Sequence, residues 1–176
     1  MFSSKRVFGP FFPIVLFLFT LSAPVAAQED APVDSVHFGF QLSYAEDTDF
    51  GIGARAEMSL RSVHPALRVV GSFDYFFPDN AGLDDVSVTY YEVNANLVYG
   101  FTLENNPNLA PYVGGGLGWT RASVSFFGES ASGTKIGTNV LVGSFFGTGK
   151  PRFFAEIRFE SRGGGEQAIL ACGLVW

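Results

Sequence analysis

Large apolar side chains alternate with small or polar ones along most of the chain, with a period of two residues. Near position 50, Phe50 and Ile52 share one face while Arg55 lies on the other. Such alternation predicts β-strands that have one apolar and one polar face. Eight segments show it, at approximately 36–44, 50–60, 67–77, 86–101, 111–123, 136–146, 153–160 and 167–176.

Turn-forming residues separate these segments, so we expect each segment to form a hairpin with the next one. Short connections are expected at Pro65, 105–108 and 147–151, and the other end of the sheet carries the links 45–49, 78–85, 121–135 and 161–166. The longest of these links is 121–135. The prediction is an all-β fold, an eight-stranded antiparallel up-and-down transmembrane β-barrel. It closes when 167–176 pairs with 36–44.

The last segment ends on an aromatic residue. One face of it carries Ala168, Leu170, Cys172, Leu174 and Trp176. A soluble domain rarely ends its chain inside a buried strand, whereas the closing strand of an outer-membrane barrel commonly ends at the membrane interface. We therefore expect Trp176 to lie at that interface.

Alternation alone does not say which face meets lipid, because a soluble barrel of the lipocalin type holds its apolar residues inside. The polar face favours the membrane alternative. Its charged residues are interleaved with glycines, and a narrow interior needs small residues to make room for long ones. Mutual pairing would satisfy charges buried there. The predicted interior polar network is Arg55, Glu57, Arg68, Asp74, Glu92, Glu156, Arg158 and Glu160.

Aromatic residues near the ends of the segments support the same choice. The chain is 47% hydrophobic and 16% aromatic, yet no apolar run after residue 28 approaches the length of a membrane-spanning helix. Outer-membrane barrels carry aromatic girdles at both membrane interfaces. The residues predicted to form such girdles are Tyr44, Tyr75, Phe77, Trp119 and Trp176.

The N-terminal region has the organisation of a secretory signal peptide. Lys5 and Arg6 precede an apolar stretch at 7–21, and small residues at Val25 and Ala27 suit signal peptidase. A retained membrane anchor is the alternative, but prolines interrupt the stretch and it is shorter than the roughly 20 residues that a spanning helix needs. We expect a signal peptide at 1–27, a barrel domain at 28–176 and export to the bacterial outer membrane.

Few residues suggest chemistry. The two histidines, His37 and His64, are expected at the periplasmic end and far from each other, so neither a metal site nor a catalytic relay is predicted. The single cysteine, Cys172, cannot form an intramolecular disulfide and is expected to face lipid. The net charge of -6 argues against nucleic acid as a partner. The chain is therefore predicted not to be an enzyme and to need no cofactor.

The run 111–119, PYVGGGLGW, together with the signal peptide and Trp176, resembles the family of small outer-membrane barrel domains that includes opacity-type proteins and the barrel domain of OmpA. The resemblance implies outer-membrane lipid and the barrel-assembly machinery as partners, with Leu170, Leu174 and Trp176 as the assembly signal. Two departures matter. The terminal aromatic is Trp where Phe is commoner, and no periplasmic peptidoglycan-binding domain follows, so a cell-wall tether is not carried over.

The predicted function is mainly structural, that of a monomeric barrel with a plugged polar interior that presents short loops at the cell surface. The charged run at 156–160 could instead line a gated passage, so a narrow pore or a conduit for small solutes is the alternative. An eight-stranded interior is only about wide enough for side chains, which favours the plug. The glycines of 111–123 could leave a cavity in this interior, which keeps the pore as an alternative. Adhesion is a third interpretation, weakened by the short loops.

Overall fold

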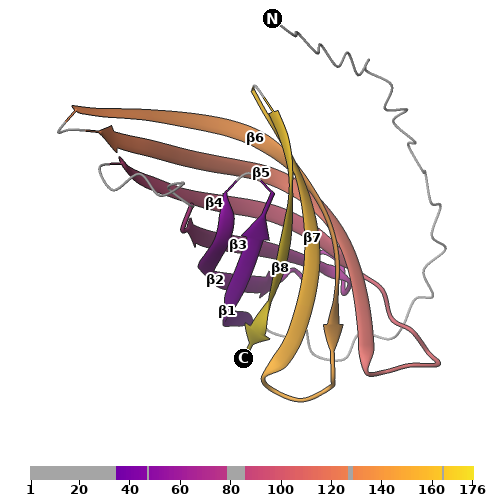
Figure 1. Ribbon diagram of the computed structural model, residues 1–176. Helices are drawn as coiled ribbons and strands as arrows, with labels where there is room; N and C mark the ends of the chain where they lie inside the picture. The colour runs from indigo at the N-terminus through magenta and orange to yellow at the C-terminus, as the bar shows by residue number, and fades with distance from the viewer. Residues whose placement is uncertain (1–34, 47, 79–85, 127–128, 164) are drawn as a thin grey trace, which may run out of the picture. The chain divides into compact units, whose positions relative to one another are not determined.

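Eight antiparallel strands form one closed barrel in the computed structural model, which describes residues 35–46, 48–78, 86–126, 129–163 and 165–176 (Figure 1). The predicted signal peptide and most of the predicted link 78–85 lie outside these residues. The strands are β1 (Val36–Ala45), β2 (Asp49–Ser59), β3 (Leu67–Phe76), β4 (Val86–Gly100), β5 (Leu109–Phe126), β6 (Glu129–Phe146), β7 (Arg152–Arg162) and β8 (Gly165–Val175).

The barrel closes as the sequence predicts. Each strand pairs with the next one along the chain, and β8 returns to pair with β1 from Gly39↔Val175 to Ala45↔Ile169. Beyond the last paired residues, the Trp176 amide donates to the carbonyl oxygen of Phe38 at 2.9 Å. The predicted eight-stranded up-and-down barrel is confirmed.

The two ends of the barrel differ. We call the end that carries Val36, Val175 and the turns 60–66, 101–108 and 147–151 the terminal rim, and the opposite end the far rim. Backbone hydrogen bonds close these turns, for example from the His64 amide to the Leu60 carbonyl at 2.9 Å. Outer-membrane barrels place short turns in the periplasm, so the terminal rim is the end that the sequence analysis expects on the periplasmic side.

The prediction of a long external loop at 121–135 is wrong. β5 and β6 remain paired as far as Phe126↔Glu129, and β4 pairs with β5 from Val86 onward. Since β3 ends opposite Tyr90 and β7 ends opposite Gly137, three strands project past the far rim (Figure 1). We call 86–89, 122–126 and 129–135 the β4–β6 extension.

The reason for this error lies in the composition of the hairpin. Serine, glycine, threonine and alanine fill most of 129–135, whose side chains are exposed. A strand with no buried face shows no apolar alternation, so the period-two signal ends where burial ends. Backbone pairing between β5 and β6 continues beyond the last residue that shows this alternation.

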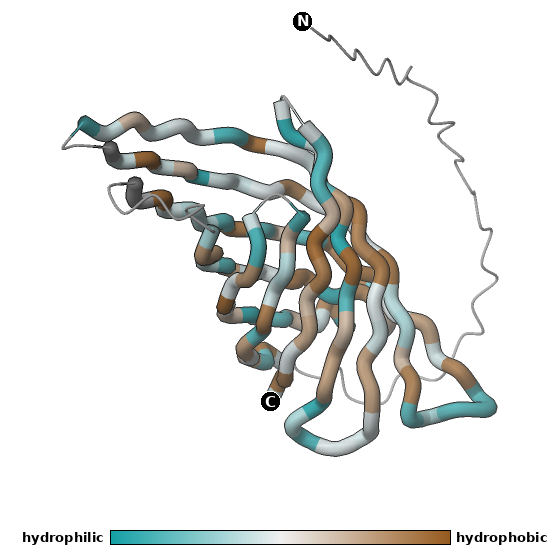
Figure 2. Tube along the Cα trace, in the orientation of Figure 1, coloured by the Kyte–Doolittle hydropathy of each residue, from teal (hydrophilic) through white to brown (hydrophobic). Residues whose placement is uncertain are grey.

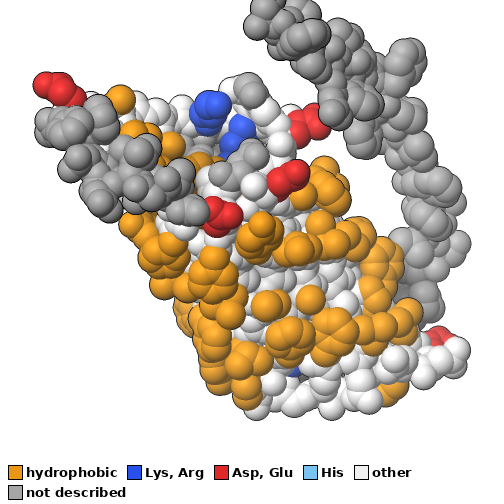
Figure 3. Space-filling view, in the orientation of Figure 1, with side chains coloured by type: hydrophobic (Ala, Val, Ile, Leu, Met, Phe, Trp, Pro, Cys, Tyr) orange, Lys and Arg blue, Asp and Glu red, His pale blue; other side chains and the backbone are white. Residues whose placement is uncertain are grey.

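The outer wall of the barrel is apolar and its interior is charged. Leu117 is 60% exposed and Val140 is 65% exposed, whereas Arg55 and Arg158 are 2% and 1% exposed. Brown and teal alternate along the strands in Figure 2, and hydrophobic side chains cover most of the wall that faces the viewer in Figure 3. A lipocalin-type barrel would have the opposite arrangement. The apolar wall therefore fits lipid.

The part of the chain that the structure describes contains no helix with the length and apolarity needed to span a bilayer.

A charged residue placed on the outer wall should show whether that wall faces lipid or water. Leu117→Arg is expected to lower the free energy of unfolding in a lipid bilayer by about 2–4 kcal/mol, because an arginine would face hydrocarbon. Val63→Arg is the matched control. Val63 is 72% exposed but lies in the turn 60–66, so its replacement should cost about 0.5 kcal/mol or less. Urea titration in bilayers measures both, and equal small effects would argue against a lipid-facing wall.

Candidate functional site

Arg158 of β7 lies at the centre of a network of buried charges in the barrel interior. Its Nε donates to Glu160 Oε1 at 2.7 Å. Its Nη2 reaches Glu92 Oε1 of β4 at 3.1 Å and Asp74 Oδ2 of β3 at 3.4 Å. All these side chains are almost wholly buried. One guanidinium therefore links strands from opposite sides of the barrel wall.

Arg55 of β2 forms a second centre in the same network. Its Nε donates to Glu57 Oε1 at 2.8 Å and its Nη1 to Glu156 Oε2 at 2.9 Å. The other oxygen of Glu156 lies 3.8 Å from Arg158 Nη1, so Glu156 joins the two centres. The Tyr112 hydroxyl also donates to Glu156 Oε2 at 2.9 Å.

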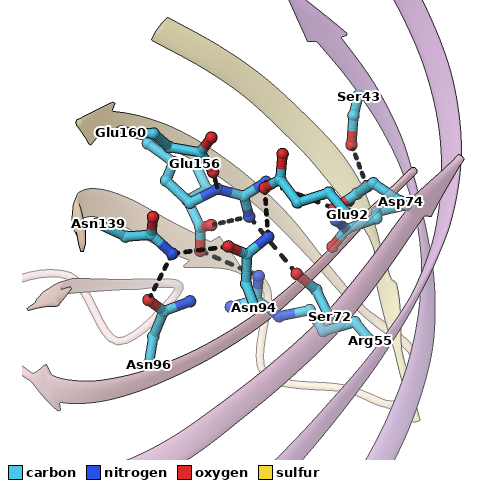
Figure 4. Close-up of polar contacts among 12 residues, drawn as sticks. Ser43, Arg55, Ser72, Asp74, Glu92, Asn94, Asn96, Asn139, Glu156 and Glu160 are labelled. Carbon is cyan, nitrogen blue, oxygen red and sulfur yellow. Dashed lines mark hydrogen bonds and ion pairs between the residues drawn. The ribbon is translucent and has the colours of Figure 1, made fainter. Parts of the chain in front are cut away.

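Neutral side chains complete the network (Figure 4). The hydroxyl of Ser43 donates to Asp74 Oδ1 at 2.6 Å. The amide of Gln41 donates to the same oxygen at 2.7 Å. Asn94 donates to Glu92 Oε1 at 2.5 Å. Buried charges are costly unless paired and hydrogen-bonded. Every charged group of the network has an ion pair, although Glu57 Oε2 and Glu156 Oε1 have no hydrogen-bond partner.

Arg162 is a member of this network that the sequence prediction missed. It contacts the carboxylates of Glu92 and Glu160 and donates to the Tyr90 hydroxyl. The prediction placed Arg162 in the link 161–166, but β7 extends to it. The regular spacing of Glu156, Arg158 and Glu160 continues to this position and could have identified it.

Arg68 is predicted in the network but lies apart from it. No described carboxylate is within 4.0 Å of its guanidinium. Its charged group lies over the rings of Tyr112 and Phe145, at 5.5 and 5.0 Å from their centroids. The other predicted residues, Arg55, Glu57, Asp74, Glu92, Glu156, Arg158 and Glu160, meet in one connected set.

The interior holds apolar clusters beside the predicted polar network. A terminal apolar cluster lies toward the terminal rim, and it contains Val70, Val98, Tyr112, Leu141, Phe145, Phe154, Ala171 and Val175. A far apolar cluster, Ala45, Phe76 and Ile169, lies toward the far rim. Arg55 connects the network to the terminal cluster, because its guanidinium lies 4.3 Å from the centroid of Phe154.

The glycines of β5 make room for side chains from its neighbours. A Cβ on Gly116 would clash with the Ala95 carbonyl oxygen, and one on Gly118 would lie 2.6 Å from Asn94 Oδ1. The Asn139 amide of β6 crosses β5 to donate to Asn94 Oδ1 of β4 at 2.7 Å. The space that these glycines vacate is thus occupied by asparagines.

Four of the predicted girdle residues lie on the outer face near strand ends, whereas Trp119 lies in the middle of β5. Tyr44 and Tyr75 are near the far ends of β1 and β3, with Phe77 just after β3 and its ring 5.2 Å from that of Tyr75. Trp119 lies 5.6 Å from Tyr91 between centroids. At the terminal rim, Trp176 lies 5.6 Å from Phe40. Their place at the membrane interface remains a prediction.

The two histidines and the cysteine have local surroundings. His37 Nδ1 lies 2.7 Å from the Trp176 main-chain oxygen, and His64 Nδ1 accepts from the Ala66 amide at 3.2 Å. Cys172 is a free thiol on the same face of β8 as Leu170 and Leu174. Among the described residues, no group of His, Cys, Asp and Glu is arranged to hold a metal ion.

A family model described as the outer membrane protein beta-barrel domain matches residues 14–151. The chain belongs to this family. Membership implies the bacterial outer membrane as its location. No curated protein matches the sequence.

Solved structures of other outer-membrane proteins have a similar fold. The crystal structure of Neisserial surface protein A has a TM-score of 0.59 at 20% identity, covering 80% of this chain and 94% of that chain. The N-terminal β-barrel domain of Pseudomonas aeruginosa OprF has a TM-score of 0.55 at 14% identity, covering 80% and 96%. A major outer membrane protein from Thermus thermophilus has 0.50 at 11% identity, covering 81% and 99%. At these identities the likeness shows the fold alone.

Breaking the network at its centre should destabilise the barrel. Arg158→Leu leaves four buried carboxylates without their shared partner and is expected to lower the free energy of unfolding by about 3–5 kcal/mol. Arg121→Leu, at an exposed position of β5, is the control and should cost about 1 kcal/mol or less. Urea unfolding followed by tryptophan fluorescence measures both. A small effect at Arg158 would contradict a stabilising role for the network.

Proposed function

We propose that the protein is a structural component of the outer membrane, a single-chain barrel with a filled lumen that neither conducts nor catalyses. The observation that carries this proposal is the buried network of Arg55 and Arg158, which crosses the lumen between two apolar clusters. Arg158, Glu92 and Phe154 are at most 1% exposed. Water-filled passages leave their lining side chains exposed, and these side chains are not.

The hollows along the barrel axis support a filled lumen. One of about 260 Å³ lies at the far rim and reaches down to Glu160 and Arg162. Another of about 310 Å³ lies at the terminal rim and reaches Glu57 and Arg68. Between these levels lie the Arg158 contacts and the terminal apolar cluster. A narrow pore would have to break buried ion pairs, whose loss costs several kcal/mol.

The far rim is the part of the molecule suited to the cell surface. Outer-membrane barrels direct the end opposite their short turns outward, so the β4–β6 extension would project from the membrane. Its exposed strand 129–135 supports surface presentation. The same extension favours adhesion as a second candidate function, because it offers paired backbone and polar side chains beyond the lipid. Catalysis finds less support, since neither histidine lies at the far rim.

The filled lumen can be tested by conductance. Wild-type protein folded into a planar lipid bilayer is expected to give no discrete current steps, because the paired charges and ring clusters leave ions no continuous water path. Heat-modifiable migration on a denaturing gel confirms that the inserted protein is folded, and a heat-denatured sample is the control. Discrete steps from the folded protein would contradict the proposal and favour the pore.

We infer that Leu170, Leu174 and Trp176 act as an assembly signal read by the barrel-assembly machinery. Leu170 and Trp176 are 53% and 48% exposed on the outer face of the closing strand. The Trp176 amide still pairs with Phe38 after the strand ends. This surface is formed last and is accessible until β8 meets β1.

Deleting Trp176 should therefore lower the yield of assembled barrel in cells several-fold. The refolded protein should lose only about 1–2 kcal/mol of stability, since two exposed hydrogen bonds, to Phe38 and His37, and one exposed ring are removed. Phe40→Ala is the matched control, because it removes the ring that contacts Trp176 but keeps the chain ending. Normal yield from the deletion variant would show that Trp176 is not part of the signal.

A further inference from the structure

Basic side chains line the hollows at the terminal rim. The hollow of about 310 Å³ is lined by His37, Arg61, Arg68 and Arg152, with Glu57 as its acidic member. A second hollow of about 360 Å³ shares His37, Arg61 and Arg152 with the first and adds Lys150. The two hollows thus form one connected basic mouth.

Two cations of this mouth, Arg68 and Arg152, make no short ion pair with a described carboxylate. Glu57 is already bonded to Arg55 at 2.8 Å. The excess of cations is unexpected in a chain whose net charge is -6. The basic side chains that line the two hollows outnumber their one acidic side chain, Glu57.

One aromatic ring contacts two of these cations. Arg68 lies 5.0 Å and Arg152 4.3 Å from the centroid of Phe145. Cation–π contacts fix each guanidinium but do not cancel its charge. Arg68 Nε is also buried without a hydrogen-bond partner. Arg68 and Arg152 carry like charges and line the same hollow, so an anion bound in that hollow would be stabilised by both.

We propose that the basic mouth binds a phosphate-bearing ligand through Arg68 and Arg152, with Lys150 at its outer edge. Guanidinium groups match phosphate oxygens in planar, bidentate geometry. A tetrahedral phosphate presents more oxygens than a carboxylate does and suits several surrounding cations better. Arg68 and Arg152 belong to the interior face of their strands, so the mouth opens to water at the lumen and not to the hydrocarbon.

The terminal apolar cluster forms the floor of this site. Tyr112 and Phe145 contact the guanidinium of Arg68. Below them, Phe154 stacks on Arg55, and the Tyr112 hydroxyl donates to Glu156 of the network. A ligand that enters the mouth therefore stops there. The site binds a solute without transporting it, and its phosphate binding can be measured separately from conductance.

Titration calorimetry with inorganic phosphate tests the proposal. The full chain is refolded in a neutral maltoside detergent, which carries no phosphate, at low ionic strength. Arg68→Gln with Arg152→Gln should weaken phosphate binding at least about tenfold, because charge-assisted hydrogen bonds are lost. Arg121→Gln with Lys135→Gln removes the same charge from exposed positions outside the mouth and should leave affinity unchanged.

The calorimetry can also overturn the proposed phosphate site. Absence of phosphate binding by the folded wild-type protein, or equal affinity in the Arg68 and Arg152 variant, would overturn the site. Since Arg68 is partly buried, the single variants Arg152→Gln and Lys150→Gln serve if the double variant fails to fold, and each should weaken binding severalfold. No change in either variant would overturn the site as well.

Nanodiscs identify the source of the phosphate. If phosphatidylglycerol discs abolish binding of inorganic phosphate while phosphatidylcholine discs preserve it, the ligand is the headgroup of an anionic lipid. Equal binding in both discs supports a water-borne phosphate ester. Both results are consistent with a phosphate-binding site, and they differ in whether the phosphate belongs to a lipid or to a soluble molecule.

Discussion

Hydrogen bonding between β1 and β8 underlies every other feature of the barrel. In hydrocarbon an unpaired backbone N–H or C=O group has no water to bond, so an open sheet cannot span a membrane. Pairing from Gly39↔Val175 to Ala45↔Ile169 removes both edges. Closure also fixes which residues face inward, since a shift of one residue would turn every side chain to the other face. The apolar wall and the charged interior follow from this single register.

Closure with eight strands makes a narrow interior, and the side chains fill it in a particular order. Paired charges occupy the middle, where Arg158 and Arg55 each serve several carboxylates. Rings occupy the terminal end, where Phe145 and Phe154 pack against guanidinium groups. The two rims therefore differ in chemistry. The far rim carries the polar β4–β6 extension, and the terminal rim carries the basic mouth.

The pattern of residues along the chain was enough to specify the strands, their order and their faces. Alternation such as that of Phe50 and Ile52 against Arg55 specifies a two-faced strand, and charged residues on the glycine-bearing face indicate which side is enclosed. The pattern also identified most of the buried network, because charges confined in a narrow barrel have only one another as partners. The hairpin beyond residue 121 escaped this reasoning, since strands in water on both sides need no alternation.

Which charges meet depends on the assembled barrel. Arg68 and Arg158 look alike in the sequence, but Arg158 reaches Glu92 of another strand while Arg68 lies on the rings of Tyr112 and Phe145. The tilt and register of the closed strands determine which side chains each arginine contacts. The residues of a single strand do not specify that tilt or that register. Arg162 and Phe154 gained their roles in the same way. A period of two gives each side chain its face, whereas its height along the barrel and its partners across the lumen depend on all eight strands together.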